Sequence, residues 1–209
     1  MDPADWDRLS RVYDRQLWLE LRAIDVAVGL ARPTSDTALL DAGTGTGAVL
    51  RALASRADPP GRVIGVDSSE AMLARVPPLL EGWELLRADV AALPFDDASF
   101  DAATAAYLLH VLAPATRMAA LEELRRVLRP GGRLVAVTPV LPGRALSRPL
   151  WQALAGLARS MPGRFSGMRP LDPRSELVKA GFTLERARTV RVGYYSLCVS
   201  ARPADKMDP

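Results

Sequence analysis

The stretch of sequence that decides the fold is Leu39-Leu40-Asp41-Ala42-Gly43-Thr44-Gly45-Thr46-Gly47, an apolar run that passes into a glycine-rich turn. This pattern predicts a buried strand that turns tightly into a helix. Glycines permit such a turn and let a ligand approach the backbone, because no Cβ stands in the way. With Ala48 the spacing also satisfies the glycine fingerprint of dinucleotide-binding proteins, so the turn alone does not identify its ligand.

Short apolar runs alternate with helical patterns on both sides of this turn, over residues 36–140. The expected strands are residues 38–42, 62–67, 83–88, 100–106 and 133–140, and the expected helices are 48–56, 70–76 and 114–128, the last one stopping at Pro130-Gly131-Gly132. The strands are apolar on both faces, which is typical of parallel strands buried between two helical layers. The alternation therefore predicts a doubly wound, Rossmann-like α/β fold.

The C-terminal part follows another pattern. A short helix is expected over residues 171–180, followed by two strands at 182–192 and 194–200 that are separated by Gly193 alone. So short a link permits only an antiparallel hairpin. The prediction is a seven-stranded sheet made of five parallel strands and a C-terminal antiparallel hairpin.

The length of 209 residues suits a single domain. Within it, residues 36–140 form the expected ligand-binding core, and residues 171–209 form the C-terminal helix and hairpin. Residues 1–35 form a helical segment outside the alternation, and residues 141–170 form an insertion after the fifth strand. These two pieces are the expected material for a lid or cap.

Composition restricts the environment and the chemistry. The single cysteine, Cys198, excludes an internal disulfide and a cysteine-based metal cage, and its apolar surroundings predict a buried thiol. The acidic N-terminus is unlike the basic start of a signal peptide, and the apolar stretch 102–115 is shorter than the roughly 18 residues that span a membrane. We therefore expect a cytoplasmic protein.

Charge is distributed unevenly along the chain. Residues 1–140 carry 15 arginines and 19 acidic residues, a net charge of −4, whereas residues 141–191 carry a net charge of +7. A local excess of cations attracts anionic partners. Alternatively, arginine is simply the preferred cation of a chain that has only two lysines.

Three carboxylates, Asp41, Asp67 and Asp89, lie at the ends of the first three expected strands. The carboxyl edge of a parallel sheet is where open α/β folds bind their ligands. Asp41 lies within the apolar end of its strand and suits a ligand that presents an ammonium group rather than a pyrophosphate. Asp67 is placed to accept hydrogen bonds from ribose hydroxyls, and Asp89 from an adenine amino group.

Together these features resemble the class I S-adenosylmethionine-dependent methyltransferases, close to the small family that includes ubiquinone and menaquinone biosynthesis enzymes. The matching pieces occur in order and at family spacing, as 39–47, 63–69 with Met72-Leu73, Ala88-Asp89, 93–95 with 99–101, and 124–132 with its Arg-Pro-Gly-Gly end. The resemblance covers about residues 36–140.

The resemblance implies a role for each matched residue. The methionine moiety would be held, directly or through water, by the residues Asp41, Gly43, Thr44, Gly45 and Gly47, the ribose by Asp67, the adenine by Met72, Asp89 and Val90, and the reactive methyl would face Ala105 to Tyr107; Ser68 would also belong to the cofactor site. Competing structural roles stay open: Asp67 and Asp89 could cap the segments that follow them, Asp41 could be a hydrogen-bond acceptor at the end of its strand, and Met72 could be a core residue.

Several methyltransferase subclasses do not fit. The chain has no asparagine, which removes the Asp-Asp-Asn metal set, and it lacks the Pro-Pro-Tyr/Phe element of amino-directed nucleic-acid enzymes. No metal is therefore expected. His110 and Tyr107 are the candidate catalytic residues, although a single histidine in an apolar stretch also fits a packed side chain.

The expected function is transfer of a methyl group from S-adenosyl-L-methionine to a small-molecule acceptor, leaving S-adenosyl-L-homocysteine. The alternatives are a cofactor-binding protein without turnover and, with less support, an NAD(P)-dependent oxidoreductase, which would leave Asp41 and Asp89 unexplained. We expect a monomer or a homodimer.

The acceptor region is expected to combine the N-terminal segment with the insertion. An apolar helical stripe around Trp151, ringed by arginines that include Arg148, could line a pocket for a hydrophobic, anionic acceptor together with Tyr13, or could contact an anionic membrane surface. Alternatively, the stripe packs on the N-terminal segment. Nucleic acid is not expected, because closely interleaved aromatics and lysines are missing.

Overall fold

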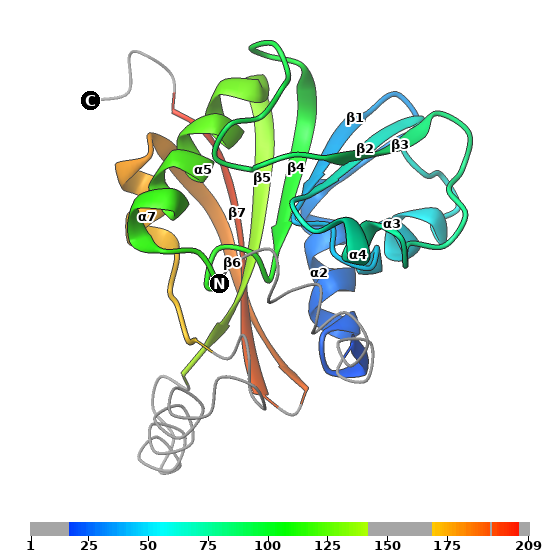
Figure 1. The fold of residues 1–209 in the computed structure, drawn as a ribbon. Helices are drawn as coiled ribbons and strands as arrows, with labels where there is room; N and C mark the ends of the chain where they lie inside the picture. Colours follow the sequence, from blue (N-terminus) through cyan, green and yellow to red (C-terminus); the bar gives the residue numbers. More distant parts are fainter. Residues whose placement is uncertain (1–16, 142–168, 193, 205–209) are drawn as a thin grey trace.

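The computed structural model describes residues 17–141, 169–192 and 194–204 (Figure 1). Within them, one sheet runs through the molecule with strand order β3-β2-β1-β4-β5-β7-β6. The strands are β1 (Ala38–Ala42), β2 (Arg62–Asp67), β3 (Trp83–Arg87), β4 (Phe100–Ala106), β5 (Leu128–Val140), β6 (Phe182–Val192) and β7 (Tyr194–Pro203). Neighbouring strands from β3 to β5 are parallel, and β7 is antiparallel to both β5 and β6. The predicted seven-stranded sheet with a C-terminal antiparallel hairpin is confirmed.

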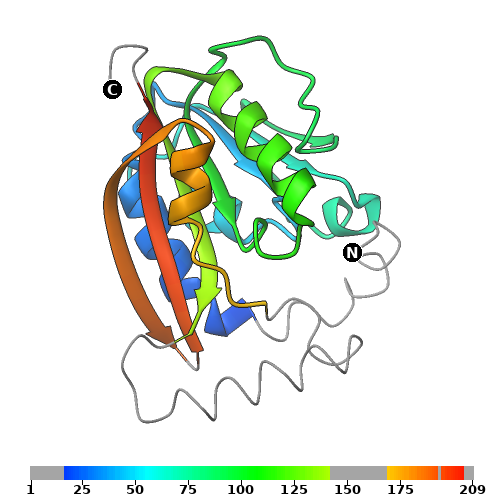
Figure 2. The same ribbon diagram turned by 90° about the vertical axis from the view of Figure 1, so that its left-hand side faces the viewer.

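Helices cover both faces of this sheet (Figure 2). They are η1 (Leu17–Leu19), α2 (Leu21–Ala31), α3 (Ala48–Ala54), α4 (Glu70–Leu73), α5 (Pro114–Val127) and α7 (Arg174–Lys179). Buried side chains of α2 and α3 form one hydrophobic cluster with the sheet, and those of α5 and α7 form a second one on the opposite face. None of the helices in the described ranges is long and apolar enough to cross a bilayer.

The bounds of β1, β2 and β4 match the prediction, whereas the start of β5 does not. Leu128 already pairs with Phe100, and pairing resumes with Arg133 opposite Ala102, so residues 129–132 bulge out of the ladder. Gly131 takes a φ of +78° in this bulge, a conformation that glycine adopts without strain. The Pro-Gly-Gly element therefore forms a bulge within a strand instead of a separate turn before it.

Helix α4 is also shorter than predicted and ends at Leu73 instead of at residue 76. Pro77 and Pro78 follow directly after residue 76, the expected end of the helix. The residue before a proline is disfavoured in helical conformation, so the apolar periodicity continues past the point where the backbone can follow it.

Candidate functional site

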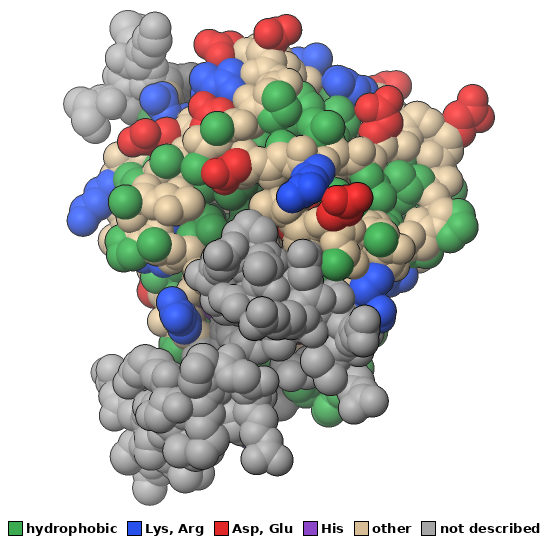
Figure 3. Space-filling view, viewed as in Figure 1, with side chains coloured by type: hydrophobic (Ala, Val, Ile, Leu, Met, Phe, Trp, Pro, Cys, Tyr) green, Lys and Arg blue, Asp and Glu red, His purple; other side chains and the backbone are tan. Residues whose placement is uncertain are grey.

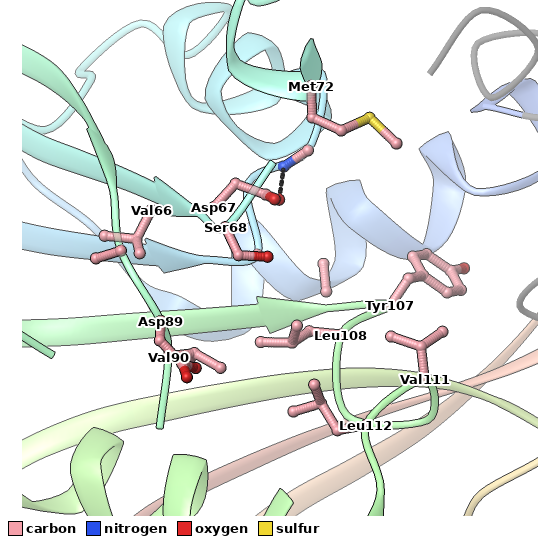
Figure 4. A pocket seen from close by; sticks show the side chains of 14 residues that line it. Val66, Asp67, Ser68, Met72, Asp89, Val90, Tyr107, Leu108, Val111 and Leu112 are labelled. Atoms are coloured by element: carbon pink, nitrogen blue, oxygen red, sulfur yellow. Dashed lines mark hydrogen bonds between the residues drawn. The ribbon is translucent and has the colours of Figure 1, made fainter. Parts of the chain in front are cut away.

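A pocket opens at the carboxyl ends of β1 to β4, at the edge where the sequence places its carboxylates (Figure 4). Its lining residues come from the ends of these strands and the segments that follow them: Gly43, Gly45, Val66, Asp67, Ser68, Met72, Ala88, Asp89, Val90, Ala106, Tyr107, Leu108, Val111 and Leu112. The lining therefore combines two carboxylates, Asp67 and Asp89, with a larger number of apolar side chains.

The glycine turn forms one wall. The backbone amides of Gly43 and Thr44 both donate to the carbonyl of Val66, at 2.8 and 2.9 Å, and this anchors the turn to β2. Gly43 has a φ of +69°, and a Cβ there would lie 2.8 Å from Cδ1 of Leu108. Gly45 also has a positive φ, but a Cβ there would meet nothing within 4 Å. The turn thus presents open backbone to the pocket at Gly45 and a tight contact at Gly43.

Asp67 joins the glycine turn to the start of α4. Its Oδ2 accepts from the amide of Gly45 at 2.9 Å (dashed in Figure 4), and its Oδ1 accepts from the amide of Ser69 at 2.9 Å. The N-cap of α4 is Ser69, whose hydroxyl accepts from the amide of Met72 at 3.2 Å. The expected capping alternative is therefore wrong in its detail, because Asp67 shapes the helix entrance without capping the helix and also borders the pocket.

The next strand end contributes Asp89 and Val90, and both line the pocket. Asp89 is exposed, and its Oδ1 accepts from the amide of Ala91 at 2.9 Å, within a turn that leads into no helix. Met72 is 2% exposed and reaches the same pocket from α4, so it is both a buried residue and a lining residue.

Asp41 lies behind the glycine turn and does not line the pocket. Its side chain is 1% exposed, and Oδ1 accepts from the Thr104 hydroxyl at 2.7 Å. Burial raises the pKa of Asp41 to about 6, and the hydroxyls of Thr104 and Thr44 offset part of this effect. No residue in the described ranges makes a hydrogen bond of ordinary geometry to Oδ2 or to the Thr44 hydroxyl, so the Thr44 contribution is the weaker one. A direct contact between Asp41 and a ligand is not what this geometry provides.

Three more of the expected binding residues, Thr44, Gly47 and Ala105, are also absent from the pocket lining. Thr44 and Ala105 are buried, and a Cβ on Gly47 would lie 2.9 Å from the Val76 side chain. These residues shape the turn and the strand end from behind.

Of the two expected catalytic residues, Tyr107 lines the pocket and His110 does not. Tyr107 directly follows β4 with a φ of +54°, lines the pocket, and shares a hydrogen bond of 2.7 Å with the hydroxyl of Ser196. Burial raises the pKa of Tyr107 above its ordinary value. His110 is 6% exposed, packs edge-on against Tyr107 with ring centroids 6.2 Å apart, and does not line the pocket.

The apolar wall was missed by sequence reasoning. Leu108, Val111 and Leu112 line the pocket, whereas the neighbouring Leu109 is fully buried in the core. All four are aliphatic residues of one short stretch, and nothing in the local sequence distinguishes the three that line the pocket from the one that is buried. The expected acceptor residues Tyr13, Arg148 and Trp151 lie outside the described residues.

Known proteins that are similar to this chain include methyltransferases. Residues 39–132 match the model of a methyltransferase domain. A demethylmenaquinone methyltransferase of Thermus thermophilus is 44% identical over 136 residues, which cover 63% of this chain and 60% of that protein. The chain spans between 31% and 60% of the length of the first three curated relatives that it matches.

Solved structures show the same fold. A Haloferax volcanii methyltransferase, solved in complex with the Trm112 methyltransferase activator, superposes with a TM-score of 0.75 at 18% identity and covers 96% of this chain and 98% of its own. The 1,6-didemethyltoxoflavin-N1-methyltransferase of Burkholderia thailandensis, solved with its substrate and S-adenosylhomocysteine, superposes with a TM-score of 0.67 at 21% identity, over 97% of this chain and 88% of its own. The ordered motifs, the strand order, the pocket at the glycine turn and these similarities lead to one conclusion: over residues 39–132 the chain carries a methyltransferase domain similar to those of the class I S-adenosylmethionine-dependent methyltransferases.

Proposed function

We propose that this protein transfers the methyl group of S-adenosylmethionine to a hydrophobic small molecule. The observation that carries the proposal is the division of the pocket. Asp67 and Asp89 contribute carboxylates from the ends of β2 and β3, and Leu108, Val111 and Leu112 contribute apolar side chains from the connection after β4. Such a pocket suits a ligand with a nucleoside at one end and a reacting group beside an apolar acceptor at the other.

The polar side fits the nucleoside. Each carboxylate oxygen of Asp67 accepts one backbone hydrogen bond and has a second lone pair that can accept from a ribose hydroxyl. Asp89 keeps Oδ2 for the adenine amino group, and Met72 and Val90 supply apolar contact to the ring. Beside Gly45 the open backbone accommodates the methionine part, and the buried carboxylate of Asp41 adds negative potential behind the turn.

When bound, the cofactor supplies an electrophilic methyl group on a sulfonium. The task of the protein is to align the acceptor with that methyl and to exclude water. Ala106 ends β4, Tyr107 follows it, and both line the pocket. The methyl group is expected to face these two residues, so the acceptor would lie beside them. Burial raises the pKa of Tyr107, and its hydroxyl shares a buried hydrogen bond with Ser196, so Tyr107 is a poor base and we expect it to line the site by its ring.

The acceptor is proposed to be hydrophobic on the strength of the apolar wall. The Thermus thermophilus relative is named a demethylmenaquinone methyltransferase, which agrees with an apolar acceptor of similar kind. The expected anionic group and the membrane contact depend on arginines outside the described residues and stay predictions. On the face drawn in Figure 3, acidic and basic side chains are interspersed, which does not favour a nucleic-acid partner there.

Titration calorimetry tests the cofactor part of this proposal. We expect S-adenosylmethionine and S-adenosylhomocysteine to bind and NAD not to bind. Tight NAD binding without a response to either sulfur ligand would overturn the assignment in favour of an oxidoreductase. Incubation with methyl-labelled S-adenosylmethionine and pooled hydrophobic metabolites then tests turnover, and binding without any methylated product would favour a non-catalytic cofactor-binding protein.

A further inference from the structure

A buried ion pair joins α5 to α7 beneath the pocket. Arg117, in the first turns of α5, is 8% exposed, and its Nη2 donates to Oε1 of Glu176 at 2.8 Å. Its Nε lies 2.8 Å from Oε2 of the same carboxylate. The two side chains are only 10% and 20% exposed, so the carboxylate holds the guanidinium in one orientation with little competition from water.

The same guanidinium binds the segment that walls the pocket. Its Nη1 donates to the carbonyls of Leu109 and Leu112, each at 3.1 Å. Both carbonyls belong to residues 107–113, the connection from β4 to α5, which supplies Tyr107, Leu108, Val111 and Leu112 to the pocket lining. One arginine therefore ties two points of the pocket wall to a carboxylate on another helix.

The opposite side of this connection is tied to the glycine turn. The Leu108 side chain lies so close to Gly43 that a Cβ there would come within 2.8 Å of its Cδ1. Leu109, between the two attachments, is fully buried in the same hydrophobic cluster as Leu177 of α7. Residues 107–113 are thus held at two places: Leu108 packs against the glycine turn, and Arg117 links two of their carbonyls to the Glu176 carboxylate of α7.

We propose that Arg117 and Glu176 are positioning residues that hold residues 107–113 in the conformation that binds the cofactor. Glu176 acts through Arg117, because the carboxylate faces Nε and Nη2 of the planar guanidinium and thereby directs Nη1 at both carbonyls. Neither residue lines the pocket, so the effect on the ligand is indirect. The identity of the ligand in this inference rests on the proposed function, but the effect on the wall does not.

The pair could instead stabilise the fold without affecting the pocket, and the chain offers a matched control for that alternative. Arg133 and Glu185 join β5 to β6 with Nε 2.7 Å from Oε2, and their side chains are 20% and 28% exposed. This second pair is somewhat more exposed, and its hydrogen bonds involve no residue of the connection 107–113. Loss of it should affect stability alone.

The first experiment compares Glu176→Gln with Glu185→Gln, well below the melting temperature of each variant. For Glu176→Gln we expect the Kd for S-adenosylhomocysteine to rise on the order of tenfold, because the binding-competent wall is populated for only a fraction of the time. For Glu185→Gln we expect a change within about twofold. Hydrogen exchange of the amides at residues 108–112 should accelerate in the first variant and not in the second.

A second variant separates positioning from stability. Arg117→Met combined with Glu176→Leu removes both charges together, and replacement of a buried pair by apolar residues often preserves the fold. We expect this double variant to melt at a higher temperature than Glu176→Gln, which leaves a buried charge unpaired, and still to bind S-adenosylhomocysteine weakly, because the carbonyls of Leu109 and Leu112 lose their donor. In turnover assays, KM for S-adenosylmethionine should rise by a larger factor than kcat falls.

Equal changes of Kd in Glu176→Gln and Glu185→Gln would overturn the inference, as would unchanged exchange at residues 108–112 in Glu176→Gln. If the wild-type protein binds no S-adenosylhomocysteine, the proposed function fails. The exchange comparison then decides the positioning role alone, since it needs no ligand.

Discussion

At the residue scale, two aspartates at the ends of neighbouring strands have opposite environments. Asp67 borders the pocket and accepts two backbone hydrogen bonds, whereas Asp41 is enclosed behind the turn with one hydroxyl donor at 2.7 Å. Burial favours the neutral form of a carboxylic acid, and it raises the pKa of Asp41. The two side chains should therefore respond differently to substitution.

Replacement of Asp67 by Ala should weaken S-adenosylhomocysteine binding by about tenfold or more, because charge-assisted hydrogen bonds contribute about 1.5–3 kcal/mol each. It should also lower the melting temperature, since the amides of Gly45 and Ser69 lose their acceptor. Ser69→Ala is the control: loss of the α4 cap should cost about 1 kcal/mol of stability with little change in Kd. Equal Kd values for Asp67→Ala and the wild type, measured by calorimetry, would leave Asp67 with a structural role only.

The raised pKa of Asp41 predicts an unusual pH dependence of the free energy of unfolding. Its pKa is about 6 in the folded protein against an ordinary value of 3.8, so the native state holds a proton that the unfolded chain releases between these values. The contribution of this group to stability therefore falls as pH rises from about 4 to 6, by up to about 3 kcal/mol. In the ligand-free protein, Asp41→Asn should flatten this part of the stability curve, as measured by urea unfolding at pH 4.5 and 7. A variant curve parallel to that of the wild type would contradict the assignment.

Substitution of His110 tests whether this residue acts in catalysis or only packs in the interior. Because it lies behind Tyr107 and outside the pocket lining, His110→Gln should keep turnover within about tenfold of the wild type, whereas loss of a general base typically costs 10²–10⁴-fold. A pH–rate profile that loses its limb near neutral pH in this variant would instead identify His110 as the base.

At the element scale, the pocket depends on two connections that contact each other. The turn after β1 presents backbone to the pocket, and the connection after β4 presents Leu108 to that turn. Neither connection is regular structure, so their relative position is set by a few contacts, among them the one between Gly43 and Leu108.

Gly43→Ala should disturb both connections at once. The φ of +69° disfavours any residue with a Cβ, by about 1–2 kcal/mol, and the new methyl group would force Leu108 to move. We expect a lower melting temperature and cofactor binding weaker by about tenfold or more, measured by thermal unfolding and calorimetry.

Gly29→Ala in α2 is the contrasting change. Gly29 has an ordinary helical backbone with nothing within 4 Å of its added Cβ, so the substitution should stabilise the helix by about 0.5–1 kcal/mol and leave Kd unchanged. Similar losses of affinity in both glycine variants would show that the Leu108 contact is not the cause.

At the scale of the whole molecule, the ligand is expected to stabilise the complete sheet. The pocket is built from the ends of four adjacent strands, β1 to β4, so its occupant contacts elements from residue 43 to residue 112. A ligand that binds only this assembled edge shifts the unfolding equilibrium of the entire domain.

Thermal unfolding measures this coupling directly. With S-adenosylhomocysteine at 100 times its Kd, the folded state gains about 2.7 kcal/mol, which corresponds to a rise in Tm of about 5–10 °C for a chain of this size. NAD at the same concentration should produce no shift. A rise in Tm with NAD that equals the rise with S-adenosylhomocysteine would contradict recognition of the methyl donor.

The sequence by itself determined most of the elements and the edge of the sheet where the pocket lies. The bounds of β1, β2 and β4, the glycine turn, the hairpin at Gly193 and the pocket-lining residues Asp67, Met72 and Asp89 were all predicted. These features depend on hydrophobic period, on turn chemistry and on the rule that parallel strands end at one edge, all of which operate over short stretches of chain.

Only the tertiary structure decided which side chains face the pocket and what holds them there. Asp41 faces Thr104, which is 63 positions away, and Arg117 meets Glu176, which is 59 positions away. Leu108 and Leu109 are adjacent and identical, yet one lines the pocket and the other is buried in the core. Local pattern cannot separate such residues, because their environments depend on the positions of distant segments once the sheet and its covering helices have packed.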